Sequence, residues 1–369
     1  MKIVCKKYNL LKGLNIVSKA VPAKTTMSIL QCILVDCTKG NIRLIANDTE
    51  MGIETIVEGD ILEKGVVALD AKMFLDITRK LPDSDITIET DQSYKTSIKC
   101  NKSNFNILGK SGDEFSYLPE VDRNDYITIS QLTLKNLVRQ TSFSVSSNDV
   151  NKIMTGIYFE IKGDNLRVIS LDGHRISIRN IILKEETDDK KVIIPSKTLD
   201  EIAKIITGES EDEVNIYFTD KYVTFEFDDT IVLSRIIEGE YFDVDRMLIN
   251  DFSTKISIDK KEFVECIERS TLLVNEGDKK PVIFAIKGNT IELRIKSTMG
   301  SMNESIDIDI EGDDLTIGFN PRFLLDALKV IDDDVIDIYL NGSRSPGIIK
   351  DIDVNYIYLI LPININTVD

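Results

Sequence analysis

The pattern of hydrophobic and polar positions repeats three times along the chain, at intervals of about 125 residues. In the central copy, a β-branched run that begins at Val192 leads to a helix-like stripe, with the i, i+3, i+4, i+7 spacing of one buried helix face. The earlier copy begins at Val66 and the later one at Ile317. In chain order, the three stripes are Phe74/Ile77/Thr78/Leu81, Leu199/Ile202/Ala203/Ile206 and Leu324/Ala327/Leu328/Ile331.

Each repeat also has a first half. Short alternating runs at Ile3–Lys6, Ile127–Ser130 and Ile256–Asp259 predict strands, and each leads into an amphipathic helix. Three strand-like runs follow each of these helices, separated by turn signals such as Lys39-Gly40-Asn41. The runs are Ile29–Cys37, Ile42–Asn47 and Gly52–Val57; Gly156–Ile161, Leu166–Leu171 and Arg175–Ile182; and Pro281–Ile286, Ile291–Lys296 and Ser305–Ile310.

The pattern therefore predicts an α+β protein of three pseudo-equivalent domains, each made of two strand–helix–three-strand units. We place the domains at 1–124, 125–251 and 252–369. Antiparallel sheets built this way bury one face, so each helix must cover part of a sheet. The short polar linkers predict rigid docking, and a repeated array of this kind normally needs a partner at its terminal faces.

Composition narrows the class of protein. The 369 residues are 42% hydrophobic and 29% charged, which is typical of a folded protein of two or three domains. No apolar run is long enough to cross a bilayer, and the start has no secretory signal. The five scattered cysteines indicate a reducing compartment, so we expect a cytoplasmic protein. The net charge of −17 excludes a general basic coat but allows a local basic lining.

A ladder of charges follows the three repeated helices. Basic, acidic and basic side chains recur at Lys72/Asp76/Arg79, Lys197/Glu201/Lys204 and Arg322/Asp326/Lys329. One interpretation is a solvated face with ion pairs worth about 0.2–0.5 kcal/mol each. The other is that the three helices point inward in a closed array and face a polyanion. Charge alone does not decide between them.

No motif predicts catalysis, a metal or another cofactor. The segment Leu171–Ile176, LDGHRI, contains the one histidine, but it has no second histidine or spaced cysteine for a metal. Asp307–Gly312 lacks the glutamate of a calcium loop, and Gly109-Lys110-Ser111 lacks a preceding glycine of a phosphate-binding loop. The C-terminal segment Tyr356–Ile363 is strongly apolar and predicts a last buried strand that borders an exposed hydrophobic groove.

Taken together, four segments resemble the bacterial DNA polymerase III β subunit family of sliding clamps. They are LDGHRIS at 171–177, EGEYFDVDRML at 238–248, GFNPRFLLDAL at 318–328 and YIYLILPI at 356–363, and the threefold repeat extends the likeness over essentially the whole chain. The resemblance implies a head-to-tail homodimer that forms a ring of six domains, with helices inside and antiparallel sheets outside. Double-stranded DNA would pass through the ring without sequence preference, and catalysis would belong to the polymerase.

The resemblance also implies site residues. DNA phosphates would be contacted by Lys24, Lys72, Arg79, Lys152, Lys197, Lys204, Arg322 and Lys329. Polymerase, clamp loader and repair proteins would dock through short peptides in a pocket between the second and third domains. Its walls would be Met154, Leu171, Gly173, His174, Arg175, Ile176, Phe242, Arg246, Met247, Leu359, Ile360, Leu361, Pro362 and Ile363, with Arg175 and Arg246 at the rim.

On the same basis, the dimer contact would place Phe105 against Leu272 and Leu273 of the other subunit. Such a clamp would work in the bacterial cytoplasm, associated with the nucleoid during replication, and would have no membrane partner. Some positions differ from the usual family pattern: Phe242 often corresponds to proline, Asn364 to a basic residue, and Ile365–Asp369 extend past the usual end. These differences bear on which peptide is preferred.

Two other hypotheses remain open from the sequence. One is a scaffold of the same fold, a divergent paralogue, that does not encircle DNA. The other is an enzyme that uses Asp172, His174 and Arg175. The basic positions on three helices favour the clamp over the scaffold, and the missing catalytic set disfavours the enzyme.

Overall fold

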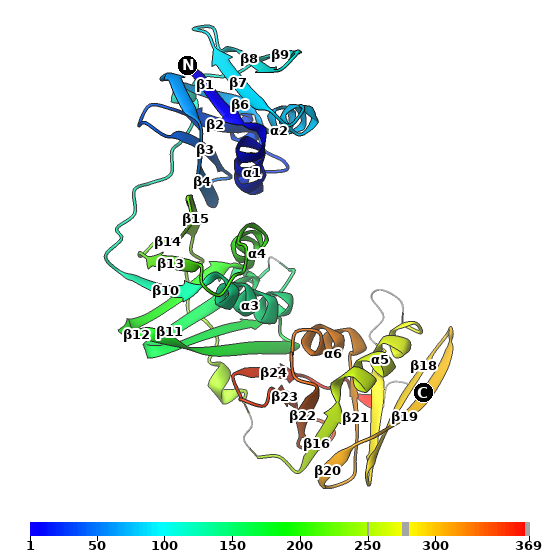
Figure 1. Cartoon of the computed structure of the whole chain (residues 1–369). Coiled ribbons are helices and arrows are strands. Elements are labelled where there is room, and N and C mark those ends of the chain that lie inside the picture. The colour runs from blue at the N-terminus through cyan, green and yellow to red at the C-terminus, as the bar shows by residue number, and fades with distance from the viewer. Residues whose placement is uncertain (149, 249–250, 275–279, 366–369) are drawn as a thin grey trace. The chain divides into compact units, whose positions relative to one another are not determined.

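We describe the protein from a computed structural model of residues 1–148, 150–248, 251–274 and 280–365 (Figure 1). The fold is α+β, with antiparallel sheets and few helices, as predicted. Contacts divide the chain into two compact units, Met1–Leu134 with Lys197–Ile236 and Lys135–Ser196 with Ile237–Asp369. Each unit is described by itself. No helix of the described residues is long and apolar enough to cross a membrane.

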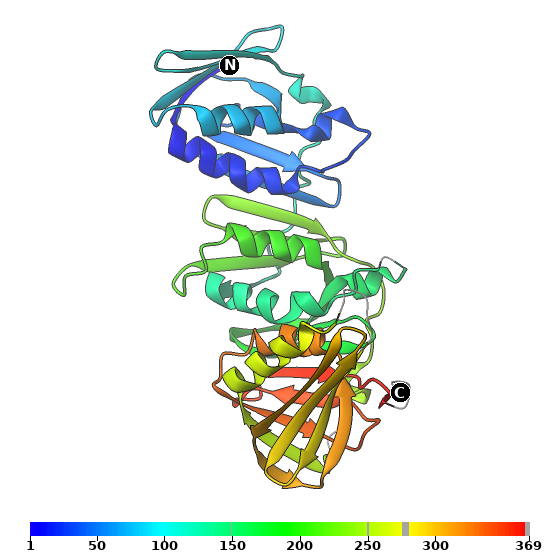
Figure 2. The same ribbon diagram turned by 90° about the vertical axis from the view of Figure 1, so that its right-hand side faces the viewer.

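The first repeat lies entirely in the first unit and follows the predicted order. Its helices α1 and α2 lie side by side (Figure 2), and α1 packs on strands β3 and β4. Asp70 caps α2 by accepting a hydrogen bond from the Met73 amide at 2.8 Å. The elements are β1 Lys2–Lys6, α1 Lys7–Val17, β2 Cys32–Asp36, β3 Ile42–Asn47, β4 Met51–Val57, β5 Asp60–Glu63, β6 Val66–Asp70, α2 Ala71–Lys80, β7 Asp85–Thr90, β8 Lys95–Cys100 and β9 Ser103–Leu108.

An eight-stranded sheet in this unit joins strands of two repeats, in the order β10-β13-β14-β15-β4-β3-β2-β6. Strand β4 of the first repeat pairs with β15 of the second, with Gly52 opposite Leu233. The Thr55 and Thr230 hydroxyls, 2.8 Å apart, reinforce this pairing. A second sheet has the order β5-β1-β7-β8-β9. The elements of the second repeat in or entering this unit are β10 Tyr126–Ser130, α3 Gln131–Thr141, α4 Ser196–Ile205, β13 Glu213–Phe218, β14 Tyr222–Phe227 and β15 Thr230–Arg235.

The second unit has the same construction. A seven-stranded sheet, β11-β12-β24-β23-β22-β16-β20, again joins two repeats, and a four-stranded sheet has the order β19-β18-β17-β21. Helices α5 and α6 lie side by side (Figure 1). The elements are β11 Gly156–Leu171, β12 Arg175–Pro195, β16 Thr254–Asp259, α5 Lys260–Thr271, β17 Val282–Lys287, β18 Thr290–Ser297, β19 Gly300–Asp307, β20 Asp309–Gly312, β21 Leu315–Phe319, α6 Pro321–Leu328, β22 Val335–Leu340, β23 Gly347–Lys350 and β24 Tyr356–Ile360.

The hairpin β11–β12 corrects one prediction. The turn signal at residues 162–165 predicts a break between two strands, but β11 continues through it and pairs with β12 from Gly156 to Leu171. The register shifts on either side of Gly163, whose φ is +60°. The extra residues lie in β12, where 188–189 and 183–186 face single residues of β11, so β12 carries the bulge and β11 continues without ending. The turn residues therefore lie within a long hairpin, opposite a bulged segment of β12.

Single-turn 3₁₀ segments replace or extend parts of the predicted strands. The run predicted to start at Ile29 begins as η2, Ser28–Gln31, and strand β2 starts at Cys32. The others are η1 Ser18–Ala20, η3 Gly112–Glu114, η4 Ser142–Ser144, η5 Lys152–Thr155 and η6 Val244–Arg246.

Segments of the predicted central domain contribute to both units, because each long sheet takes strands from it. The domain boundaries at residues 124 and 251 remain a prediction.

The predicted apolar stripes form the packed faces of the helices. Phe74, Leu199 and Leu324 are fully or almost fully buried. In the second unit, Phe284 stacks edge-on between Phe263 and Phe319, with ring centres 5.6 Å away on each side. Burial of one helix face leaves the opposite face, which holds the charge ladder, at the surface.

Candidate DNA- and peptide-binding surfaces

The basic residues of the ladder are exposed on three related helices. Lys72 and Arg79 lie on α2, Lys197 and Lys204 lie on α4, and Arg322 and Lys329 lie on or just after α6. Lys24 and Lys152 are also exposed, the first before η2 and the second at the start of η5. The side chains are thus available at the surface of their own units, as contact with phosphates would require.

At least four of the ladder cations nevertheless have carboxylate partners. The pairs are Arg79–Asp76 at 3.4 Å, Lys197–Asp48 at 2.7 Å, Lys204–Glu201 at 2.9 Å and Lys329–Glu268 at 2.9 Å. The hydrogen bond from Lys204 to Glu201 raises the pKa of the lysine. The Arg79 and Lys329 pairs are exposed and worth about 0–1 kcal/mol, so a phosphate can replace the carboxylate there at little cost. In the other two pairs the lysine is exposed, but the Asp48 and Glu201 side chains are only 8% and 19% exposed. Both interpretations of the ladder are therefore compatible with its geometry.

Five of the ten apolar side chains predicted for the peptide pocket belong to or pack on one hydrophobic cluster of the second unit, whereas Ile360 is buried in a different cluster. Leu171, Ile176 and Leu359 are buried in the first of these clusters, and Met154 and Phe242 are partly buried against it. Strand pairing explains this proximity, because Ile176 of β12 lies opposite Leu359 of β24. The long hairpin and the C-terminal strand thus place residues distant in sequence on one packed surface.

A tight turn, Asp172–Arg175, connects β11 to β12 beside this cluster. The Asp172 carboxylate accepts hydrogen bonds from the backbone amides of His174 and Arg175, at 2.9 and 3.2 Å. Gly173 has φ +87°, a left-handed conformation that favours glycine. The Asp172 carboxylate therefore stabilises the turn. The His174 ring stacks on the Phe323 ring, with 6.2 Å between the ring centres. In the described ranges no group of three or more His, Cys, Asp or Glu residues could hold a metal ion.

Arg175, expected at the rim of the pocket, is only 8% exposed. Its guanidinium donates to Asp172 at 2.9 Å, to Asp326 at 2.6 Å and to the Phe143 carbonyl at 2.6 Å. It also lies over the Phe323 ring, 4.2 Å from the ring centre. Burial by itself would lower the pKa of Arg175, but Tyr358 and the two carboxylates outweigh burial and raise it.

The sequence reasoning missed three partners of this arginine: Phe143, Phe323 and Asp326. It assigned Asp326 to the charge ladder, where the repeat register places it, but the carboxylate binds Arg175. The sequence contained a signal for such a partner, because an arginine at the start of an apolar strand is expected to be buried and a buried cation needs an acidic partner. The arginine side chain joins the turn to α6, so its contact with a peptide remains a prediction.

The other expected rim residues are more accessible. The Arg246 side chain is 86% exposed and pairs with Asp243 at 2.8 Å. Met247 and Leu361 are 42% and 41% exposed, and the Leu361 amide donates to the His174 carbonyl at 2.9 Å. Pro362 and Ile363 line a separate cavity of about 470 Å³ with Thr316 and Arg344. Of the C-terminal extension Ile365–Asp369, residues 366–369 lie outside the described residues.

The residues expected at a dimer contact lie at free edges of two sheets. Phe105 is 41% exposed on β9, the last strand of the five-stranded sheet. Leu272 is 76% exposed at the end of α5, with Leu273 beside it, and α5 packs on β19, the last strand of the four-stranded sheet. Each edge belongs to its own unit, and among the described residues one side of its outermost strand has no strand partner.

Comparison with known proteins identifies the family. Family models of the N-terminal, central and C-terminal domains of the DNA polymerase III beta subunit match residues 1–119, 128–243 and 245–364. The beta sliding clamp of Staphylococcus aureus is 34% identical, with 98% of this chain and 99% of the relative covered. The chain therefore belongs to the DNA polymerase III beta subunit family.

Solved structures support this assignment across the whole fold. The crystal structure of a candidate beta subunit from Eubacterium rectale has 58% identity and a TM-score of 0.97, covering 99% of this chain and 100% of that one. The DNA polymerase sliding clamp of Bacillus subtilis has 33% identity and a TM-score of 0.95, covering 99% of both chains. The protein is thus a three-domain sliding-clamp subunit of the DNA polymerase III beta family, an accessory subunit without catalytic activity of its own.

Proposed function

We propose that two copies of this chain join head to tail in a ring that encircles double-stranded DNA and tethers the replicative polymerase. Membership of the sliding-clamp family supports this function, and the free sheet edges support the mode of closure. An edge strand invites pairing with another strand, and a head-to-tail contact can close into a ring. In such a dimer β9 of one copy would meet β19 of the other, with Phe105 packed against Leu272 and Leu273.

The observation that carries the DNA-binding part is the recurrence of exposed basic side chains at matching positions of α2, α4 and α6. These residues would contact phosphates and no base edges, so binding would be independent of sequence and sensitive to salt. Four of these cations would exchange a carboxylate contact for a phosphate contact, and exchangeable contacts of this kind would allow the ring to slide. The ring itself, not strong binding, would keep the protein on DNA.

The cluster around Leu171, Ile176 and Leu359 would form the floor of a docking site for short partner peptides. Leu361, Met247 and Arg246 are the exposed residues at its border. They suit an extended peptide with apolar anchors and one acidic or amide group. The replicative polymerase, the clamp loader and repair proteins would compete for this site, in the cytoplasm and at the nucleoid.

Topology provides the decisive test. The protein is loaded by its clamp loader onto nicked circular DNA, and the retained fraction is measured by gel filtration before and after a restriction enzyme linearises the circle. We expect retention on the circle and loss from the linear DNA, because only enclosure depends on closed ends. Equal retention on both forms would refute encirclement.

Docking is tested separately with the double variant Leu361→Ala, Pro362→Ala. We expect binding to the replicative polymerase, measured by surface plasmon resonance, to weaken about tenfold, because truncation of an important apolar side chain in an interface costs more than about 1 kcal/mol. Light scattering should still report a dimer. Loss of the dimer with unchanged polymerase binding by the remaining protein would contradict the assigned position of the site.

A further inference from the structure

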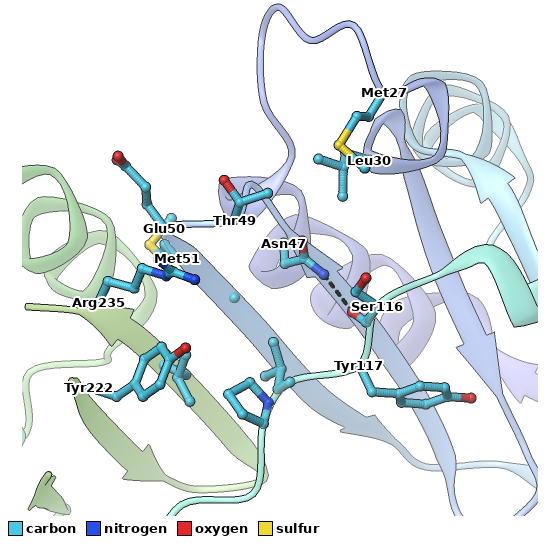
Figure 3. A pocket seen from close by; sticks show the side chains of 14 residues that line it. Met27, Leu30, Asn47, Thr49, Glu50, Met51, Ser116, Tyr117, Tyr222 and Arg235 are labelled. Atoms are coloured by element: carbon cyan, nitrogen blue, oxygen red, sulfur yellow. Dashed lines mark hydrogen bonds between the residues drawn. The ribbon is translucent and has the colours of Figure 1, made fainter. Parts of the chain in front are cut away.

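A cavity of about 240 Å³ lies in the first unit, where strand β4 begins and its neighbour β15 ends (Figure 3). It is distinct from the peptide site proposed above, which is built only from residues of the second unit. Its volume is below the range of about 300–1,000 Å³ that is typical of ligand pockets, so it suits one or two side chains of a peptide.

The lining of this cavity is mainly apolar. Leu30, Met51 and Leu233 are buried beneath it, and Met27 and Tyr117 at its border are 52% and 47% exposed. Exposed methionine and tyrosine side chains are adaptable, amphipathic groups that favour contact with a protein partner. The cavity therefore combines a rigid floor with an adaptable border.

Backbone contacts fix the shape of the floor. The Asn47 amide group donates to the Ser116 carbonyl at 2.7 Å, which holds the segment that carries Tyr117 against β3 (Figure 3). Gly52 provides room for Leu118: a Cβ at position 52 would lie 2.1 Å from the Leu118 Cδ2. The shape of the cavity is thus set by specific contacts.

One charged group faces the cavity without a carboxylate partner among the described residues. Arg235 is exposed, its guanidinium lies 5.9 Å from the centre of the Tyr222 ring, and its backbone amide donates to the Glu50 backbone carbonyl at 2.8 Å. The Glu50 carboxylate itself points away from this guanidinium (Figure 3). A planar guanidinium beside apolar side chains is suited to a carboxylate that arrives with an apolar neighbour.

Net charge makes this preference informative. The chain carries −17, so its overall field repels an acidic peptide and attracts a basic one. Attraction of an acidic peptide to the first unit must therefore be local, and Arg235 is the cation at the cavity. If the cavity binds an acidic peptide more tightly than a basic one, the cause is a local charge, because the net charge of the chain favours the basic peptide.

We propose that this cavity is a second docking site, which binds an extended peptide of a partner protein through an acidic residue at Arg235 and an adjacent aliphatic side chain on the floor at Met51 and Leu233. The proposal rests on the first unit alone and does not depend on the peptide site of the second unit. The two sites would allow one clamp subunit to hold two peptide segments at once.

The test uses the full-length protein with 13C-labelled methionine methyl groups and two probe peptides, acetyl-Gly-Asp-Leu-Leu-amide and acetyl-Gly-Lys-Leu-Leu-amide. Met27 and Met51 report on the new site, whereas Met154 and Met247 report on the second unit. We expect the aspartate peptide to shift the Met27 and Met51 signals with a dissociation constant below about 1 mM, and the lysine peptide to bind there at least tenfold more weakly.

The variant Arg235→Glu should reverse this preference at Met27 and Met51, because the charge at the cavity is inverted. Lys99→Glu, the same charge change at an exposed position of β8 outside the cavity, should leave the preference unchanged. Absence of Met27 and Met51 shifts, equal shifts with both peptides, or shifts confined to Met154 and Met247 would each overturn the proposal. A preference unaffected by Arg235→Glu would overturn the role of the arginine.

Discussion

The turns Asp48–Met51 and Asp172–Arg175 occupy matching places in the first and second repeats. Each follows the end of a strand, and each aspartate accepts hydrogen bonds from the amides two and three residues later. The strands after the turns, β4 and β12, then pair with β15 and β24 of the next repeat. The backbone design of the two junctions is the same.

Side chains make the two junctions different. The last residue of the first turn is Met51, whereas the last residue of the second turn is Arg175. On the partner strands, Arg235 ends β15, whereas the matching residue in the second junction is Leu361, just after β24. One junction thus has a buried arginine that binds internal acids, whereas the other has an exposed arginine beside a cavity. A repeated backbone can place the same chemical group in a structural role or at a binding surface, depending on which strand carries it.

The largest expected effect comes from removing the buried arginine. Arg175→Ala leaves the largely buried Asp172 carboxylate without its cation, and loss of one partner of a buried pair costs about 3–5 kcal/mol. Asp326 also loses its partner, but its side chain is 43% exposed and can be hydrated. Arg235→Ala, its counterpart at the other junction, should change stability by no more than about 0.5 kcal/mol. Urea unfolding followed by circular dichroism measures both, and similar losses would contradict the distinction between the two arginines.

Replacing the turn aspartates gives an intermediate effect. Both Asp48→Ala and Asp172→Ala remove an acceptor for two backbone amides, with an expected cost of about 1–3 kcal/mol each. Asp172→Ala should cost more, because Asp172 also accepts from the buried Arg175, whereas Asp48 pairs with exposed Lys197. Differential scanning calorimetry compares the two variants. A larger loss for Asp48→Ala would mean that the guanidinium contact contributes little.

The smallest effect concerns the second residue of each turn. Thr49 has φ +77° and Gly173 has φ +87°, yet only glycine adopts this region without strain. We expect Gly173→Thr to destabilise the protein by about 1 kcal/mol, since no atom lies within 4 Å of the new Cβ and the backbone alone is strained.

The reciprocal change, Thr49→Gly, should stabilise the first turn by somewhat less than about 1 kcal/mol, because relief of strain exceeds the added entropy of the unfolded chain. The same calorimetric measurement tests this variant beside Gly173→Thr. Changes of the same sign in the two variants would show that the turns are not conformationally equivalent.

Periodicity was sufficient to predict the repeated strand–helix units. The stripes through Phe74, Leu199 and Leu324 identified buried helix faces because a 3.6-residue period depends on local sequence. The same reasoning failed at residues 162–165, where the turn signal lies within the long hairpin, opposite a bulged segment of β12. Whether a local turn signal ends a strand depends on the opposite strand, which a local pattern does not contain.

The candidate sites were predictable to a similar extent. The repeat register placed Lys197 and Lys204 on an exposed face, as expected, but it could not show that Asp48 lies beside Lys197. Similarly, it placed Asp326 in the charge ladder, although the side chain binds Arg175 from another repeat. Contacts between repeats depend on how sheets join, and this information is spread over long separations in sequence.

The pairing of β4 with β15 has a consequence for how the chain is made. Strand β4 ends at Val57, but its neighbour is completed about 180 residues later, at Arg235. At a synthesis rate of about 5–20 residues per second, β4 waits roughly 10–35 s on the ribosome before its partner strand exists. During that interval one copy's unfinished edge can pair with that of a neighbouring nascent chain, so spacing between ribosomes and chaperone binding would influence the yield of native protein.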